Sequence, residues 1–189
     1  MRRTMLQFGG VILLAGLLVF ACDDSSTNSN DDDTSDMPFG TQRDIAMADS
    51  MWKAYSGYTD NWDQYPGLEG WQDGNSPHGA YLKYYVNDVA KGDLENYPYG
   101  SVIIKENYPA EDESQPGPIT FMTRIEGYDA ENYDWFYAKY LPDGTLDEND
   151  VGVKLAGRVA KGAGEGGADA ACIGCHSGAD GNDFVFAND

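Results

Sequence analysis

Two cysteines and a histidine near the C-terminus have the types and spacing of a covalent cofactor site. They stand in the run Cys172-Ile173-Gly174-Cys175-His176, the CxxCH spacing that is typical of c-type haem attachment. Two thiols three residues apart on a helical turn can reach the two vinyl groups along one porphyrin edge, and the histidine that follows can ligate the iron. The sequence therefore predicts one covalently bound haem c per chain, held by Cys172, Cys175 and His176.

The same spacing also occurs in disulfides, in thioredoxin-like redox pairs and as half of a zinc site. A zinc site would need more ligands, and the only other histidine is His78. A redox pair normally follows a βαβ pattern, which the Gly- and Ala-rich run before Cys172 does not offer. We therefore expect haem at this position.

The N-terminal residues have the pattern of an export signal. Arg2 and Arg3 precede an apolar run over 11–20, and the letters LVFAC that end at Cys22 resemble a lipobox, in which the cysteine is diacylated. An ordinary signal peptide or an uncleaved anchor stays open, although the apolar run is short for a membrane span. We expect residues 1–21 to be a lipoprotein signal peptide and Cys22 to carry the lipid anchor. This would place the protein in the periplasm or at another face of the cell envelope.

Composition limits the classes of partner and the number of domains. The 189 residues include 32 acidic and 12 basic side chains, for a net charge of −20. This charge argues against nucleic acid as a partner. Residues 23–36 are only Asp, Ser, Thr and Asn, which cannot form a core, so 22–38 is predicted to be a disordered acidic tether. The remaining residues, 39–189, are long enough for one haem domain.

The elements that must position the haem residues are short strands and a few helices. Apolar residues recur at helical spacing over Arg43–Tyr55, and a loop rich in Gly, Pro and aromatics follows over 57–79. Asn87 is expected to cap a short helical turn. Strands are predicted at Ala80–Val86, Ser101–Asn107, Ile119–Ile125 and Trp135–Leu141, with a further candidate at Val151–Val159 and a helix at Ala168–His176. The fold class is therefore α+β, a mainly antiparallel β-sheet with a few helices and a C-terminal CxxCH haem-binding helix.

The position of CxxCH bears on the sixth coordination site of the iron. In the common all-helical electron-transfer cytochromes, CxxCH lies near the N-terminus and a methionine far downstream is the second axial ligand. Here the residues after His176 include no Met and no His. An upstream ligand could be His78 or Met122, but we interpret His78 as an ordinary residue of a Pro-His-Gly loop and Met122 as a residue packed on a strand face. We expect a five-coordinate iron with an open distal face, which favours ligand binding or catalysis.

Several short runs resemble one family when taken together. They read PHG at 77–79, YVN at 85–87, GSVIIKE at 100–106, DWF at 134–136 and, after CxxCH, DFVF at 183–186. This combination resembles the cytochrome P460 family, a relative of cytochrome c′-β.

The resemblance implies periplasmic monohaem proteins on an antiparallel sheet, often homodimers. Catalytic members oxidise hydroxylamine to nitrous oxide and pass electrons to an external acceptor. A strand lysine in those enzymes is cross-linked to a porphyrin meso carbon, and Lys105 matches it, although a strand-end lysine can also reach solvent or pair with an acid. A distal carboxylate takes protons from the substrate, and Asp129 lies closest to that position, with Glu126 near by. Phe121, Phe136 and Tyr140 are candidates to wall the haem pocket.

Three functional classes follow from this resemblance. The first is a redox enzyme acting on hydroxylamine or a related small nitrogen compound, favoured by Lys105 with a nearby carboxylate. The second is a non-catalytic protein of the c′-β kind that binds NO or another gas. The third is a tethered electron-transfer cytochrome with a sixth protein ligand. Homodimerisation is an open expectation in all three.

Overall fold

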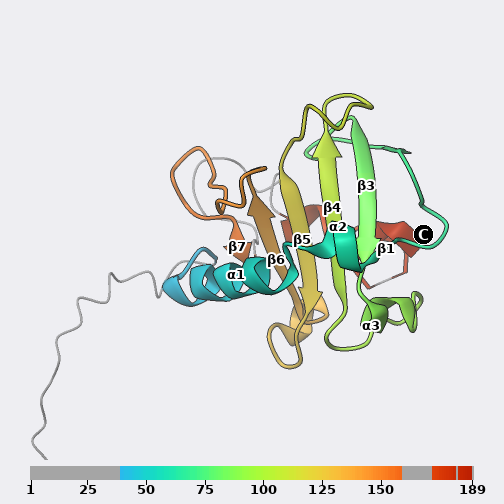
Figure 1. Ribbon diagram of the computed structural model, residues 1–189. Helices are drawn as coiled ribbons and strands as arrows, with labels where there is room; N and C mark the ends of the chain where they lie inside the picture. Colours follow the sequence, from blue (N-terminus) through green and yellow to red (C-terminus); the bar gives the residue numbers. More distant parts are fainter. Residues whose placement is uncertain (1–38, 159–171, 182, 189) are drawn as a thin grey trace, which may run out of the picture. The chain divides into compact units, whose positions relative to one another are not determined.

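The structure is a computed structural model that describes residues 39–158, 172–181 and 183–188 (Figure 1). A seven-stranded antiparallel sheet has the order β1-β3-β4-β5-β6-β7, with β2 also paired to β3. The strands are β1 (Asp63–Gln64), β2 (Gln72–Asp73), β3 (Tyr81–Val86), β4 (Val102–Tyr108), β5 (Ile119–Arg124), β6 (Trp135–Tyr140) and β7 (Ala156–Gly157). The helices are α1 (Gln42–Tyr55), α2 (Tyr58–Asn61), α3 (Asp88–Lys91) and α4 (Cys172–His176), with 3-10 turns at Ala130–Asn132 and Phe186–Asn188. The predicted α+β class is confirmed.

Strands β3 to β6 confirm the four main predicted strands to within one residue at each end. The further candidate at Val151–Val159 contributes only the two residues of β7, and its last residue lies outside the described part of the chain. Strands β1 and β2 and helix α2 lie in the segment predicted as a loop. Two-residue strands have no detectable period, because pairing with β3 rather than local sequence creates them. The predicted signal peptide, the tether and residues 168–171 also lie outside the described residues.

Helix α1 begins with a capping box that its sequence encodes. The Thr41 hydroxyl oxygen accepts a hydrogen bond of 3.2 Å from the backbone N–H of Asp44, and the Asp44 carboxylate accepts one from the backbone N–H of Thr41. Ala48 and Met51 on its inner side are buried, so α1 packs against the sheet. The predicted helix over Arg43–Tyr55 is confirmed. No helix among the described residues is long and apolar enough to cross a membrane.

The predicted cap Asn87 also ties two strands together. Its side-chain oxygen accepts hydrogen bonds of 3.0 Å from the backbone N–H groups of Ala90 and Val102. The first bond caps α3, and the second reaches the start of β4, the strand that carries Lys105. Asn87 therefore helps to set where β4 begins beside β3.

The sheet has a buried cluster on each face. Helices α1 and α2 cover one face, while the C-terminal segment, red in Figure 1, covers the opposite face. Because side chains alternate along a strand, neighbouring residues belong to different faces. Ile104 and Phe136 face α1, whereas Ile103 and Tyr137 face the C-terminal segment and Val185 within it. The second face is the one that forms the candidate site.

Candidate functional site

Helix α4 carries the three residues predicted to hold the haem. Buried Ile173 fixes this short helix in the core cluster, and the backbone N–H of Ser177 donates 2.9 Å to the Ile173 carbonyl. Cys172 is half-buried with a free thiol, and burial raises the pKa of that thiol to about 12. Cys175 is exposed, and both cysteines line the same cavity as His176. One turn of helix thus brings two sulfur atoms and an imidazole to one cavity.

The His176 imidazole is neutral, and a hydrogen bond fixes its orientation. Its Nδ1 lies 2.7 Å from the carbonyl oxygen of Phe184, and because a carbonyl can only accept, Nδ1 must carry the proton. The lone pair is therefore on Nε2. Burial, reinforced by the positive charge of Lys105, lowers the pKa of His176 to about 3. Histidines that ligate metals usually donate their other ring N–H in this way.

The carbonyl that orients His176 belongs to a constrained C-terminal turn. Phe184 adopts a left-handed backbone conformation, with φ of 68°. The backbone N–H of buried Val185 donates 3.0 Å to the Asp183 carboxylate, which holds the turn in place. Sequence reasoning noted DFVF only as part of a family resemblance. No local pattern could have shown that Phe184 would meet His176, because the contact depends on how the turn packs.

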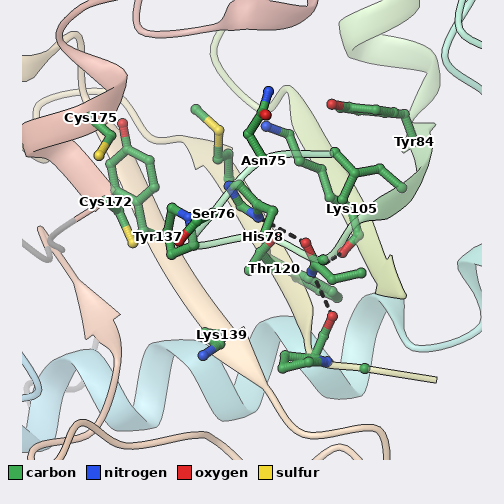
Figure 2. Close-up of a pocket in the computed structure, with 18 of the residues that line it drawn as sticks. Asn75, Ser76, His78, Tyr84, Lys105, Thr120, Tyr137, Lys139, Cys172 and Cys175 are labelled. Carbon is green, nitrogen blue, oxygen red and sulfur yellow. Dashed lines mark hydrogen bonds between the residues drawn. The ribbon is translucent and has the colours of Figure 1, made fainter. Parts of the chain in front are cut away.

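A cavity of about 720 Å³ lies beside α4 (Figure 2). Cofactor sites commonly have volumes of about 300–1,000 Å³. Four successive pairing partners form one row across the sheet at its floor: Tyr84 on β3, Lys105 on β4, Thr120 on β5 and Lys139 on β6. The sheet therefore presents two lysines to the cavity. The Lys139 ammonium is paired at 2.9 Å with the Asp147 carboxylate.

Two buried hydroxyls at this floor have no partner in the described part of the chain. They are Thr120 Oγ1 and the Tyr137 hydroxyl, and both residues line the cavity. An unsatisfied buried hydroxyl costs about 1–3 kcal/mol. The Tyr137 ring centroid lies 5.5 Å from that of His176. Two cysteines and an imidazole whose Nδ1–H is already donated line a cavity of this size, and this set of residues fits a bound haem.

Lys105 is buried on the cavity floor, with 6% of its surface exposed. No hydrogen bond or ion pair involves its ammonium among the described residues, and its Nζ lies 5.3 Å from the centroid of the Tyr84 ring. Burial lowers the pKa of Lys105 to about 8. The other explanation offered for this residue, a strand-end amine in solvent or paired with an acid, is wrong. Lys105 is instead a buried amine with a lowered pKa that faces a cavity.

His78 and Met122 both line the cavity as well. Met122 is buried on β5 and packs in the core cluster of this face. His78 is half-buried in the loop before β3, and its Nδ1 lies 2.8 Å from Oδ1 of Asn107 on β4. Figure 2 shows His78 projecting into the cavity from this loop.

Two of the three aromatic residues predicted to wall the pocket do not line the cavity. Phe136 and Tyr140 belong to the cluster on the opposite face of the sheet. Phe121 contributes atoms to the lining, but its ring packs against Trp52 and Tyr140 on that opposite face. Alternation indicates which strand residues share a face, but not which face holds the cavity. The aromatic residues on the cavity side include Tyr84 and Tyr137.

The two predicted distal carboxylates also lie away from the cavity lining. Asp129 is buried, where its Oδ2 accepts hydrogen bonds from Arg158 Nε at 2.8 Å and from Asn132 Nδ2 at 2.7 Å. Glu126 is exposed. Asp129 is therefore a structural ion-pair partner in the turn after β5. Asp73 at the exposed rim is the one acid among the described lining residues.

The zinc alternative gains no support from the structure. Across 39–158, 172–181 and 183–188, no three His, Cys, Asp or Glu side chains are grouped so that they could hold a metal ion. The donors at α4 are two thiols and one imidazole beside a large cavity. This set suits a cofactor that brings its own ligands to the metal.

Comparison with known proteins agrees with this site. A search of curated proteins finds no matching relative. The family model described as Cytochrome P460 matches residues 69–187, which is more than half of the chain. The matched region includes the loop of His78, the floor strands and the CxxCH helix, and the family implies a haem cofactor. The chain therefore belongs to the cytochrome P460 family.

Proposed function

We propose that the chain binds one haem c covalently, through thioether bonds from Cys172 and Cys175, with His176 as an axial ligand. Three observations support this: both thiols line the cavity, the His176 imidazole is neutral, and its Nδ1–H is already donated to a carbonyl. A haem-stained denaturing gel and intact mass of the purified protein test the attachment, with Cys172→Ala as the comparison.

We further propose that the protein oxidises hydroxylamine or a related small nitrogen compound and passes the electrons to an external acceptor. The single observation that carries this proposal is Lys105, a buried amine on the cavity floor with a pKa lowered to about 8. When bound, the haem supplies the one-electron redox chemistry. A partly neutral amine is a nucleophile, so Lys105 is placed to form the lysine–porphyrin bond that the family resemblance implies. The new C–N bond would replace a meso C–H bond and an amine N–H bond, and an external two-electron oxidant of the peroxide class would take up the two electrons and two protons released. Such a bond would change the electronics of the cofactor.

Mass and absorption spectra of the wild type and Lys105→Met test this role. We expect the wild type to show a strongly red-shifted ferrous Soret band and a mass that fits a lysine–haem bond after proteolysis. Lys105→Met is expected to show an ordinary c-type spectrum and to lose hydroxylamine oxidation. Lys139→Met is the matched control, because Lys139 lies in the same row but is paired with Asp147. Identical ordinary spectra in all three proteins would end the cross-link proposal.

A second candidate function is reversible binding of NO or another gas without catalysis. One observation favours it: no buried carboxylate lines the cavity among the described residues, so the expected proton acceptor is missing. Stopped-flow binding of NO to the reduced protein, combined with an absence of hydroxylamine turnover, would select this function over oxidation.

Location is a separate proposal. We propose that the protein is exported and anchored by lipid on Cys22, on the basis of its lipobox-like LVFAC sequence and the acidic stretch that follows. Membrane fractionation of the full chain and of Cys22→Ser tests it. The wild type should sediment with membranes and the variant should be soluble. Equal distribution of the two proteins would contradict lipidation.

A further inference from the structure

The two histidines of the chain face each other across the cavity. The His78 and His176 ring centroids lie 6.4 Å apart, with an angle of 84° between the ring planes. His78 comes from the loop before β3, whereas His176 ends α4, almost a hundred residues later in the chain. The fold therefore brings both imidazoles of the sequence to one place.

Both rings have their Nδ1 atoms committed to hydrogen bonds. His176 Nδ1 donates to the Phe184 carbonyl, at 2.7 Å, and His78 Nδ1 lies 2.8 Å from Asn107 Oδ1. The Asn107 amide cannot be reversed without loss, because its Nδ2 donates 2.6 Å to the Pro118 carbonyl. Oδ1 is therefore an acceptor, His78 Nδ1 carries the proton, and its Nε2 keeps the lone pair. Each histidine thus has the protonation pattern of a metal ligand with a fixed second partner.

The loop that carries His78 is held against β4 by a close backbone approach. A Cβ added at Gly79 would lie 2.4 Å from the Tyr108 carbonyl oxygen, so a residue with a side chain cannot sit there without a shift. The backbone N–H of His78 also donates 2.8 Å to the Asn75 carbonyl. These contacts position the ring before any cofactor binds.

The separation of the rings matches ligation of one metal ion from two sides. Metal–imidazole bonds of about 2 Å place the centroids of two opposed imidazoles about 6 Å apart. We propose that His78 is the second axial ligand of the haem iron, opposite His176, so that the resting iron is six-coordinate. This rests on the proposed covalent haem and replaces our expectation of an open distal face. A small nitrogen compound or gas would then have to displace His78 before it could bind.

Spectroscopy of the ferric and ferrous holoprotein tests this assignment independently of activity. The wild type should be low-spin, with the large-g electron paramagnetic resonance signal that perpendicular axial ligand planes produce. His78→Ala should be high-spin, and added imidazole should restore the low-spin spectrum. Carbon monoxide should bind ferrous His78→Ala at least about tenfold more tightly, because removing the internal ligand makes the whole population competent to bind.

Two results would overturn the assignment. One is a high-spin wild type at neutral pH. The other is a His78→Ala variant that stays low-spin without added imidazole, in which case Met122→Leu identifies Met122 as the ligand if it becomes high-spin. Haem-stained gels report attachment, and turnover assays report hydroxylamine oxidation. A low-spin, histidine-dependent spectrum without turnover would therefore support ligation by His78 while contradicting the proposed reaction.

Discussion

The indole Nε1 of Trp135 donates a buried hydrogen bond of 2.7 Å to the carbonyl oxygen of Asp183. Trp135 opens β6 in the sheet, and Asp183 is the residue before Phe184, whose carbonyl orients His176. The bond therefore connects strand β6 to the turn that orients His176. It is the link through which the sheet sets the direction of the His176 ring.

Trp135→Phe should lower the free energy of unfolding by about 1–3 kcal/mol, because the Asp183 carbonyl loses a buried donor. The looser turn should also shift the reduction potential of the holoprotein. Chemical denaturation followed by circular dichroism, and a redox titration, measure the two effects. Trp71→Phe is the control, since the Trp71 indole nitrogen makes no hydrogen bond within the described ranges. Equal effects of both substitutions would mean that lost ring volume, and not the hydrogen bond, matters.

Gly79→Ala should displace the His78 loop. The new methyl group would meet the Tyr108 backbone, and overpacking of this kind typically costs about 1–3 kcal/mol. We expect a thermal midpoint below that of the wild type and a ferric spectrum with an increased high-spin fraction. Gly57→Ala is the matched control, because its added Cβ would meet only the flexible end of Asn61, at 3.2 Å. If Gly79→Ala destabilises the protein but leaves the spin state of the iron unchanged, the position of the His78 loop does not control ligation of the iron.

Asp129→Asn should weaken the fold without altering the haem spectrum. Asp129 pairs with Arg158 at 2.8 Å and lies outside the cavity lining. Loss of hydrogen bonds to a charged group costs about 1.5–3 kcal/mol. Denaturation should show this loss, while hydroxylamine turnover, if present, should stay within a factor of about two, since no chemical step uses this carboxylate. A loss of turnover with normal stability would restore Asp129 as the proton acceptor.

Stability should depend on pH through His78. Its folded pKa is lowered to about 4 from an ordinary value of 6.5, so between these values the unfolded chain binds a proton that the folded chain does not. The contribution of neutral, buried His78 to the free energy of unfolding is fully present above pH 6.5 and is lost as the pH falls toward 4. The difference in unfolding free energy between the wild type and His78→Gln should therefore shrink on acidification, by at most about 1.4 kcal/mol per pH unit. A constant difference from pH 7 to 4 would show that His78 titrates normally.

Much of the fold could be predicted because its elements have local signals. Short stretches of sequence are enough to predict the helix after Thr41, from its helical spacing, and strands β3 to β6, from their β-prone residues. No local signal shows which face of the sheet holds the cavity. For this reason the sequence predicts Phe136 at the cavity, whereas its neighbour Tyr137 is the residue on that face. The choice of face depends on which segments cover each side, and those segments are distant in the chain.

Only part of the candidate site could be predicted from the sequence. CxxCH has a local pattern with a chemical meaning, and Lys105 was found through the family resemblance. The prediction of Asp129 as the distal carboxylate is not supported, because a turn residue can point in many directions and Arg158 binds this carboxylate outside the cavity lining. The position of His78 opposite His176 could not be seen from sequence, because it depends on a 57–79 segment whose strands exist only through pairing with β3.

The order of the segments along the chain has a consequence for biogenesis. Every strand of the cavity floor precedes Cys172, so a growing chain completes its sheet residues before the CxxCH helix α4 emerges. Until that helix and the turn at Phe184 arrive, the cluster that holds Ile103 and Met122 lacks the cover of Ile173, Phe184 and Val185. A nascent chain stalled before Cys172 should therefore expose part of its apolar core and be bound by chaperones or cut by proteases. Completion of the chain, and not formation of the sheet, is then the event that commits the molecule to its fully packed form.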